Sequence, residues 1–168
     1  MITQVIGELN RNKNVFRALL QGIPREMQGW KPLPEKWSLL EIVCHLFDEE
    51  REDFRARLSH VIDMPEEPLP KIDPVAWVTG REYARQNFEK KLTAFIEERI
   101  KSVEWLASLK NPPLDNAYIH EKFGPMSGYL FLNNWLAHDY LHIRQIIRTK
   151  YEYLKVLSPV ELGYAGEW

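Results

Sequence analysis

The sequence predicts an all-α protein, a four-helix bundle of the up-down-down-up type with one long crossover loop. Four stretches carry apolar residues at helical spacing, and a proline-rich segment separates the second from the third. The chain shows no two-residue hairpin signal between alternating runs and no repeat at a solenoid period. With 168 residues, it is expected to form a single domain, residues 1–168, around one core.

The first two helices have clear ends. The first is expected over about residues 2–21, where Gly22-Ile23-Pro24 ends it. The second is expected over about residues 38–61, and Ser38 with Glu41 fits a capping box at its start, in which each side chain pairs with a free backbone N–H group. Four prolines between residues 65 and 74 then exclude regular helix and predict the crossover loop.

The third helix is expected over about residues 80–109, and Asn111-Pro112-Pro113 ends it. A polar connection then leads to the fourth helix, expected over about residues 127–149 with Ser127 as its cap. The C-terminal tail, residues 151–168, is aromatic but weakly patterned. It is compatible with a short extra helix, a cover over the bundle or a contact with a partner.

The composition excludes several classes of function. With 22 basic and 24 acidic residues, the formal charge is -2, which gives no electrostatic support for binding nucleic acid or a membrane surface. The N-terminus lacks the pattern of a secretion signal, and no segment approaches 18 uninterrupted apolar residues. A cytoplasmic location is therefore expected. The single cysteine, Cys44, agrees with a reducing compartment and is interpreted as a buried, inert thiol.

Three histidines are the candidate metal ligands. His138 and His142 lie four residues apart in the fourth helix, so their imidazoles lie about 40° apart around its axis and can reach one ion. His45 lies in the second helix and is expected to face inward at a depth that the pair can also reach. Three neutral imidazoles suit Zn, Ni, Cu or Fe(II) and leave coordination positions for water or substrate.

The histidines also have alternative interpretations. Each of the three can instead be an ordinary hydrogen-bonded core residue without metal. The His138–His142 segment resembles the HExxH motif of zinc proteases with Asp139 in place of Glu, but no histidine follows it as a third ligand. The Glu-x-x-His pairs of di-iron bundles are absent, and one cysteine cannot form a four-thiolate zinc site.

Further polar residues accompany the three histidines. The acidic run 48–50 is interpreted as a solvated face, except that Glu49 is predicted to turn toward the site as a fourth ligand, a general base or an orienting partner of His45. Asp139, Arg144 and Gln145 are candidates for orienting the metal ligands through hydrogen bonds. For Asp139 and Arg144, the alternative is an ion pair at the surface. His60 and His120 are expected at the surface or in local hydrogen bonds.

Two segments carry a family resemblance. Residues 37–46 (WSLLEIVCHL) and 138–146 (HDYLHIRQI) resemble the two signatures of the DinB/YfiT-like superfamily, and the similarity covers roughly residues 2–150. The resemblance implies a four-helix bundle, often homodimeric, with one divalent metal ion held by His45, His138 and His142. Zinc or nickel is the first expectation, with iron, manganese or copper as alternatives.

Several functions remain compatible with this site. Members of the superfamily include thiol-dependent transferases and isomerases, hydrolases and proteins without a known activity, and a fold does not define a reaction. The first hypothesis is a metal-dependent enzyme that activates a thiol or a water for attack on a small-molecule substrate. A bound metal ion can lower the pKa of either nucleophile, and the family resemblance implies thiol-S-transfer with a low-molecular-weight thiol slightly more than hydrolysis. The alternatives are a non-catalytic bundle, stabilised by metal or related to stress, and a metal-free interaction module.

Overall fold

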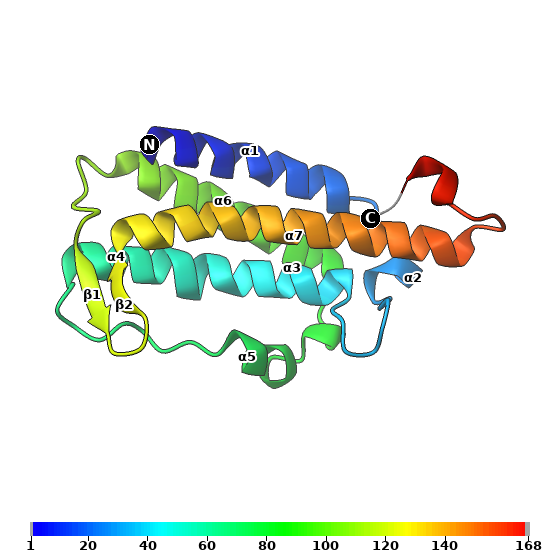
Figure 1. Cartoon of the computed structure of the whole chain (residues 1–168), viewed down its shortest axis with the longest axis horizontal. Helices are drawn as coiled ribbons and strands as arrows, with labels where there is room; N and C mark the ends of the chain where they lie inside the picture. The colour runs from blue at the N-terminus through cyan, green and yellow to red at the C-terminus, as the bar shows by residue number, and fades with distance from the viewer. Residues whose placement is uncertain (1, 167–168) are drawn as a thin grey trace.

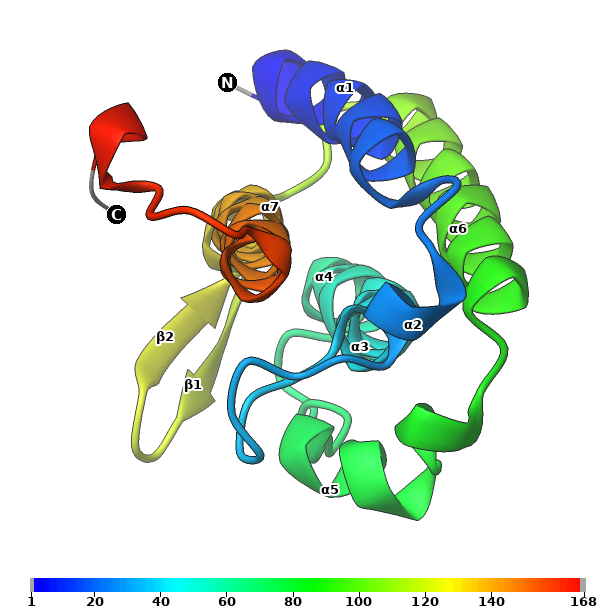
Figure 2. The same ribbon diagram turned by 90° about the vertical axis from the view of Figure 1, so that its right-hand side faces the viewer.

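Four long helical segments form a bundle in the computed structural model, which describes residues 2–166. They are α1 (Ile2–Leu20), the segment from α3 (Leu39–Asp48) to α4 (Ala56–Asp63), α6 (Phe88–Ser108) and α7 (Gly128–Leu157). Figure 1 shows α1 and α7 running in one direction and the other two in the opposite direction. Seen end on, α1 packs against α6 and α7, and α3 and α4 close the bundle on the opposite side (Figure 2). The predicted up-down-down-up bundle is confirmed.

The second long segment begins at the predicted capping box. The Ser38 hydroxyl accepts a hydrogen bond from the Glu41 backbone N–H (3.3 Å), and the Glu41 carboxylate accepts one from the Ser38 N–H (2.8 Å). The segment then changes its winding at η1 (Glu49–Arg55), a π-helix that was not predicted, and ends at Asp63. π-helical turns are rare in proteins, and those that occur are often at functional sites.

The crossover between α4 and α6 runs along the length of the bundle (Figure 1). It contains the short helices α5 (Pro74–Gly80) and η2 (Tyr83–Arg85). The prediction that the third long helix begins at residue 80 is wrong. Glu82 has a φ of 48°, in the left-handed region, and Asn87 caps α6 by accepting a hydrogen bond from the Lys90 N–H (2.9 Å), so that helix begins at Phe88.

The connection between α6 and α7 contains a β-hairpin that was not predicted. Strands β1 (Ala117–His120) and β2 (Gly124–Ser127) pair antiparallel, from Ala117 opposite Ser127 to His120 opposite Gly124. A three-residue loop joins them, and Gly124 after it has a φ of 71°, which glycine adopts without a steric penalty. Three-residue hairpin loops commonly end on such a residue, so the turn signal was present in the sequence.

The last helix, α7, extends beyond its predicted end at residue 149 to Leu157. Its predicted cap is confirmed, because the Ser127 hydroxyl accepts a hydrogen bond from the Leu130 N–H (3.2 Å). The first part of the predicted tail therefore belongs to α7, and a single turn, η3 (Gly163–Ala165), follows it. Another short helix, α2 (Arg25–Gln28), precedes α3. Among residues 2–166, no helix is long and apolar enough to cross a membrane.

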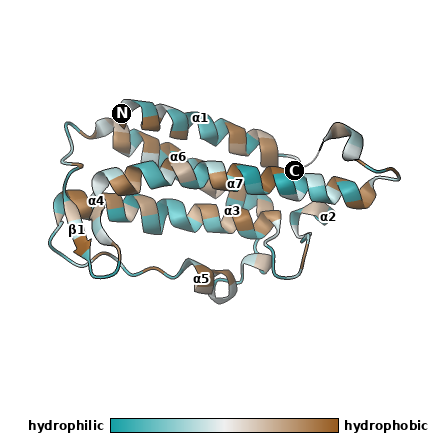
Figure 3. Ribbon diagram, in the orientation of Figure 1, coloured by the Kyte–Doolittle hydropathy of each residue, from teal (hydrophilic) through white to brown (hydrophobic). Residues whose placement is uncertain are grey.

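A layer of buried polar residues divides the core of the bundle. Hydrophobic and hydrophilic residues alternate along each long helix (Figure 3). One apolar cluster, around Phe16 and Ile146, lies toward one end, and a second, around Leu9 and Trp135, lies toward the other. Each long segment contributes buried polar residues between its contributions to the two clusters: Asn12, Glu49, Glu50, Arg99, Asp139 and His142. This polar layer contains the candidate site.

Candidate metal centre

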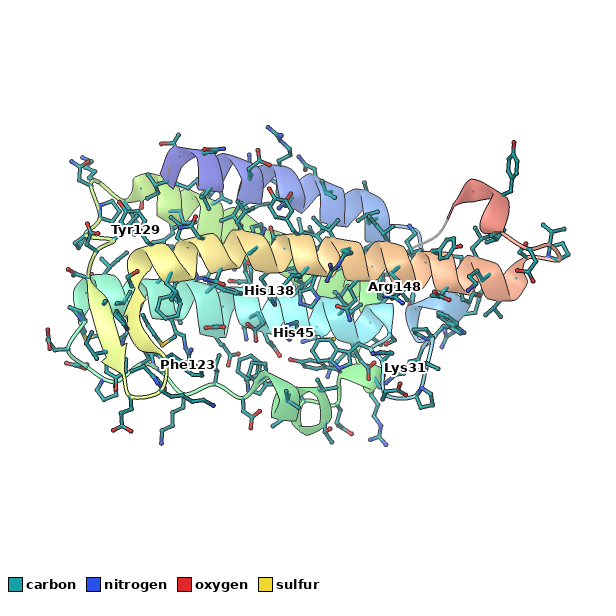
Figure 4. The ribbon with its side chains drawn as sticks, viewed as in Figure 1. Lys31, His45, Phe123, Tyr129, His138 and Arg148 are labelled. Carbon is teal, nitrogen blue, oxygen red and sulfur yellow. The ribbon has the colours of Figure 1, made fainter. Side chains whose placement is uncertain are left out.

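The three predicted histidines converge on one point between α3 and α7. The Nε2 atom of His138 lies 3.1 Å from Nε2 of His45 and 3.0 Å from Nε2 of His142. Figure 4 shows His138 on α7 and His45 on α3 meeting near the middle of the bundle. His138 and His142 are four residues apart on α7 and therefore lie on the same face of the helix. The antiparallel packing of α3 against α7 brings His45 to them.

Aromatic side chains enclose the three imidazoles. The Trp37 ring lies 4.7 Å from the ring of His45 and is stacked parallel to that of His142 at 6.5 Å, measured between centroids. Phe54, on the π-helical segment, lies 5.0 Å from the His138 ring. His45 and His142 are consequently only 6% and 9% exposed, whereas His138 is partly exposed.

Burial keeps the three imidazoles uncharged at neutral pH. Burial, together with the charge that a neighbouring histidine would carry, lowers the pKa of His45 to about 3 and that of His138 to about 2. The pKa of His142 is also lowered by burial, although the Gln145 side chain opposes this shift. A neutral imidazole has a free lone pair on one ring nitrogen, which is the form that binds a metal ion.

The geometry of the cluster fits a divalent ion. Zn–N bonds of 2.0–2.1 Å in a tetrahedral site place two ligand nitrogens about 3.3 Å apart, close to the 3.0 and 3.1 Å separations seen. The three ring nitrogens lie within 4.8 Å of one another. Nitrogen ligands of this kind suit zinc, nickel, copper and ferrous iron, and the donor set alone does not choose among them.

Glu49 lies behind the cluster. Its Oε1 atom is 3.9 Å from Nδ1 of His45, the ring nitrogen on the side away from His138, and both atoms are buried without a hydrogen-bond partner. The group of ligand atoms within 4.8 Å consists of the three histidines and does not include Glu49. Of the three predicted roles for Glu49, orientation of His45 agrees best with this position. Burial and the adjacent Asp53 raise the pKa of Glu49.

The prediction that residues 48–50 form a solvated face is wrong. All three side chains are buried, because the π-helical segment begins here and turns them toward different partners. Asp48 accepts a hydrogen bond from the Tyr83 hydroxyl (2.6 Å) and pairs with Arg81 (2.8 Å). Glu50 accepts hydrogen bonds from Arg99 and from the Trp135 indole N–H (3.0 Å).

A buried charge network lies next to the histidines. Arg99, on α6, donates two hydrogen bonds to Glu50 (2.8 Å each) and two to Asp139 (2.7 Å each). Asp139 also accepts a hydrogen bond from Asn12 on α1 (3.0 Å). The Asp139 carboxylate thus binds Arg99 and Asn12, neither of them a histidine. It is not the surface ion pair considered as an alternative, and its predicted orienting role stays a prediction.

The remaining predicted residues lie in several environments. Gln145 lies close enough to His142 to affect its pKa, while Arg144 is exposed on α7. His60 and His120 are outside the cluster, and each forms a local hydrogen bond, with the Glu67 carbonyl and with the Lys122 N–H respectively. Cys44 is fully buried, and burial raises its pKa to about 12, in agreement with an inert thiol.

Sequence reasoning missed the partners that surround the histidines. Trp37 was identified only as the first residue of a family signature, and no role was predicted for Arg99 or Asn12. The available signal for Arg99 was its position, because it falls at helical spacing on the inward face of α6, between the apolar residues Ile96 and Leu106.

The fold and the cluster together define a four-helix-bundle protein with three histidines converging between two antiparallel helices. The sequence profile of the DinB superfamily matches residues 8–146, and the chain belongs to this superfamily.

A solved structure shares the fold. YfiT from Bacillus subtilis, described as a probable metal-dependent hydrolase with an unusual four-helix bundle topology, superposes with a TM-score of 0.79 over 90% of this chain and 87% of that chain. The two sequences are 14% identical, so the likeness establishes the shared fold alone. A search of curated proteins found no match.

Proposed function

We propose that His45, His138 and His142 hold one divalent metal ion, zinc or nickel in the first instance, and that the protein is a metal-dependent enzyme acting on a small molecule. The observation that carries the proposal is the convergence of three neutral imidazoles, in which Nε2 of His138 lies 3.1 Å from Nε2 of His45 and 3.0 Å from Nε2 of His142. Iron, manganese and copper are the alternative ions. A bound divalent ion supplies Lewis acidity that makes a water or a thiol nucleophilic near neutral pH.

The residues of this chain provide the surroundings for such chemistry. Two helices fix the three imidazoles, and Trp37 and Phe54 exclude water from their sides. His138 is the most exposed of the three. Glu49 beside Nδ1 of His45 and Gln145 beside His142 are proposed to orient these two rings.

Elemental analysis of untagged protein tests the metal site. The wild type is expected to carry close to one divalent ion per chain, and His142→Ala to lose it. His60→Ala is the matched control, because His60 is only partly buried, lies outside the cluster, and its Nε2 atom bonds a backbone carbonyl. Equal metal content in wild type and His142→Ala would refute the proposed site.

The nucleophile is proposed to be a water or a low-molecular-weight thiol. The description of the similar YfiT as a probable metal-dependent hydrolase favours water, whereas the family resemblance of the two histidine-containing segments favours transfer to a thiol. Metal-loaded protein should be assayed on one panel of esters, amides and electrophiles, with and without small thiols. Product that forms only with thiol identifies a transferase, and product that forms equally without it identifies a hydrolase.

A non-catalytic, metal-stabilised bundle is the competing function. The orphaned Nδ1 atoms and the dense burial around His45 and His142 are compatible with it. Metal-loaded protein that is stabilised by its ion but converts no member of the panel would favour this function over an enzyme.

A homodimer and a cytoplasmic location are proposed as well. Tyr140, Ile147 and Leu154 are exposed at seven-residue intervals along α7, and a second copy of the chain would cover such a stripe. Light scattering after size-exclusion chromatography tests the dimer, and fractionation of cells that express the protein tests the location. A monomeric mass at all concentrations would refute the dimer.

A further inference from the structure

A pocket of about 850 Å³ opens beside the histidine cluster. One wall is the chain segment before α3, and the other is the C-terminal half of α7. Its volume is within the range of sites that bind small organic ligands. The residues that line it are Pro32, Leu33, Lys36, Trp37, Leu141, Arg144, Gln145, Arg148, Thr149 and Glu152.

The pocket carries an excess of positive charge. Three basic side chains line it, those of Lys36, Arg144 and Arg148, against one acidic side chain, Glu152, so the formal charge of the lining is +2. Glu152 already pairs with Lys155 outside the lining (3.5 Å). Within residues 2–166, none of the three cations forms an ion pair or a side-chain hydrogen bond, so their charges are uncompensated by the protein.

Two of these cations are placed at a cost to the helix. Arg144 and Arg148 lie four residues apart on α7, and like charges at this spacing destabilise a helix by a few tenths of a kcal/mol. A bound anion between them would convert this repulsion into attraction. Figure 4 shows Arg148 beyond His138 along α7, toward the C-terminal end of the helix.

The pocket meets the histidine cluster through two shared side chains. Trp37 lines the pocket and also packs against the rings of His45 and His142. Gln145 lines the pocket and acts on the pKa of His142. None of the three histidines is itself in the lining. A ligand seated here would therefore lie against Trp37, with its far end at the arginines and its near end toward the cluster.

Contacts outside the pocket hold its two walls in place. Lys31 forms an ion pair with Glu41 of the capping box (2.7 Å), which fastens the segment before α3 to the start of that helix. Trp30 packs edge to face against Tyr153 of α7, with 5.3 Å between ring centroids. The pocket is thus formed before a ligand arrives, which lowers the entropic cost of binding.

We propose that this pocket binds the anionic end of the substrate, a carboxylate or phosphate group held by Lys36, Arg144 and Arg148. The apolar part of the substrate packs on Trp37, Leu33 and Leu141 and directs its reactive group to the histidine cluster. That the bound anion is a substrate rests on the proposed function. The binding of an anion by the pocket does not require metal and can be tested without it.

The test is calorimetric titration of metal-free and zinc-loaded protein with phthalate, which combines an aromatic ring with two carboxylates. Phthalamide, its uncharged counterpart, and inorganic phosphate, which lacks the ring, are the comparison probes. Phthalate is expected to bind both forms of the protein, more tightly than phosphate and with an affinity that falls as salt is added. Phthalamide is expected to bind more weakly than phthalate.

Charge-removing variants distinguish the effect of the cations in the pocket from the effect of the protein's net charge. Arg144→Gln and Arg148→Gln should each weaken phthalate binding about fivefold, and the double variant about twentyfold. The double variant Lys71→Gln, Lys110→Gln is the matched control, because it removes the same charge from exposed positions outside the lining and should leave the affinity unchanged. Circular dichroism should show that all these variants are folded.

Each contrary outcome overturns the proposal. These outcomes are no phthalate binding by the wild type, equal weakening in the two double variants, equal affinity for phthalamide, or binding that requires zinc and ignores the arginines. The last would place the anion on the metal and leave the proposed metal site intact. Conversely, anion binding by a protein whose His142→Ala variant keeps its metal would support the pocket and refute the metal site.

Discussion

Arg99 and Asp139 form two parallel hydrogen bonds, Nη1 to Oδ2 and Nη2 to Oδ1, each 2.7 Å long, with both side chains fully buried. This paired geometry is the strongest form of the arginine–carboxylate interaction. Asp139 directly follows His138, so the contact attaches the histidine-bearing part of α7 to α6. The candidate site therefore depends on a helix that contributes none of its three histidines.

Replacing Arg99 should strongly destabilise the protein. In Arg99→Met the carboxylates of Glu50 and Asp139 lose their shared cation while remaining buried, and breaking a buried pair typically costs about 3–5 kcal/mol. Urea unfolding of metal-free protein measures this loss. Lys101→Met, on the same helix but at an exposed ion pair with Glu98, should cost less than about 1 kcal/mol. Equal losses in the two variants would contradict the prediction.

Metal should raise the melting temperature. An ion that binds only the folded state stabilises it by about 2.7 kcal/mol when free metal is a hundred times its dissociation constant. For a chain of this size, that free energy corresponds to an increase of about 5–10 °C. Calorimetry with zinc, with nickel and with a chelator measures the shift. His142→Ala should melt at one temperature in all three conditions, and a metal-dependent shift in this variant would count against the site.

Stability of the metal-free protein should fall as the pH decreases below about 6.5. Burial lowers the pKa of His45 to about 3 and that of His138 to about 2 in the folded state, whereas both titrate near 6.5 when unfolded. Between these values the unfolded chain binds more protons, so acid favours unfolding, by up to about 1.4 kcal/mol per histidine and pH unit.

Urea unfolding at several pH values measures this slope. His45→Gln should reduce it, because one of the contributing groups is removed. His60→Gln, at a partly buried position outside the cluster, should leave it unchanged. A slope that His45→Gln does not alter would contradict the assignment.

Glu49 should contribute to metal affinity through His45. The Glu49→Ala variant leaves Nδ1 of His45 without an acceptor nearby, and loss of such an orienting partner typically weakens metal binding about 10- to 100-fold. Glu49→Gln keeps a carbonyl oxygen that can accept the Nδ1–H hydrogen bond and should retain most of the affinity. Competition with a chromophoric chelator measures both variants. An alanine variant that binds as tightly as the wild type would exclude the orienting role.

Cys44 should be unreactive in the folded protein. It is fully buried, and burial raises its pKa to about 12, so almost no thiolate exists near neutral pH. A chromogenic disulfide reagent should modify the thiol rapidly in urea and only very slowly in buffer. Rapid reaction of the native protein would show that the thiol is accessible, contrary to this structure.

The parts of the fold that local chemistry defines could be predicted from the sequence. Apolar periodicity located the long helices, and the capping box of Ser38 and Glu41 marked the start of α3. The start of α6 was misplaced because the apolar pattern does not reveal the left-handed backbone of Glu82. The π-helical segment was missed because propensity and periodicity assume regular α-helical winding.

The candidate site also has parts that could be predicted from the sequence and parts that could not. His138 and His142 were recognisable as a pair because neighbours on one helical face follow from spacing alone. The burial of Asp48, Glu49 and Glu50 could not be predicted, since three consecutive acidic residues suggest a solvated surface unless their partners are known. Arg99 meets Glu50 and Asp139 across 49 and 40 residues of sequence, and such long-range pairing is a property of the tertiary fold.

The helix order of the bundle also has a consequence for synthesis on the ribosome. The first helix, α1, packs mainly against α6 and α7, the last long helices to be made. The N-terminal half of a nascent chain therefore lacks the surfaces that cover α1, and the polar layer lacks Arg99, Asp139 and His142. Native packing and the three-histidine cluster should be completed in the same late step, after α7 has left the exit tunnel.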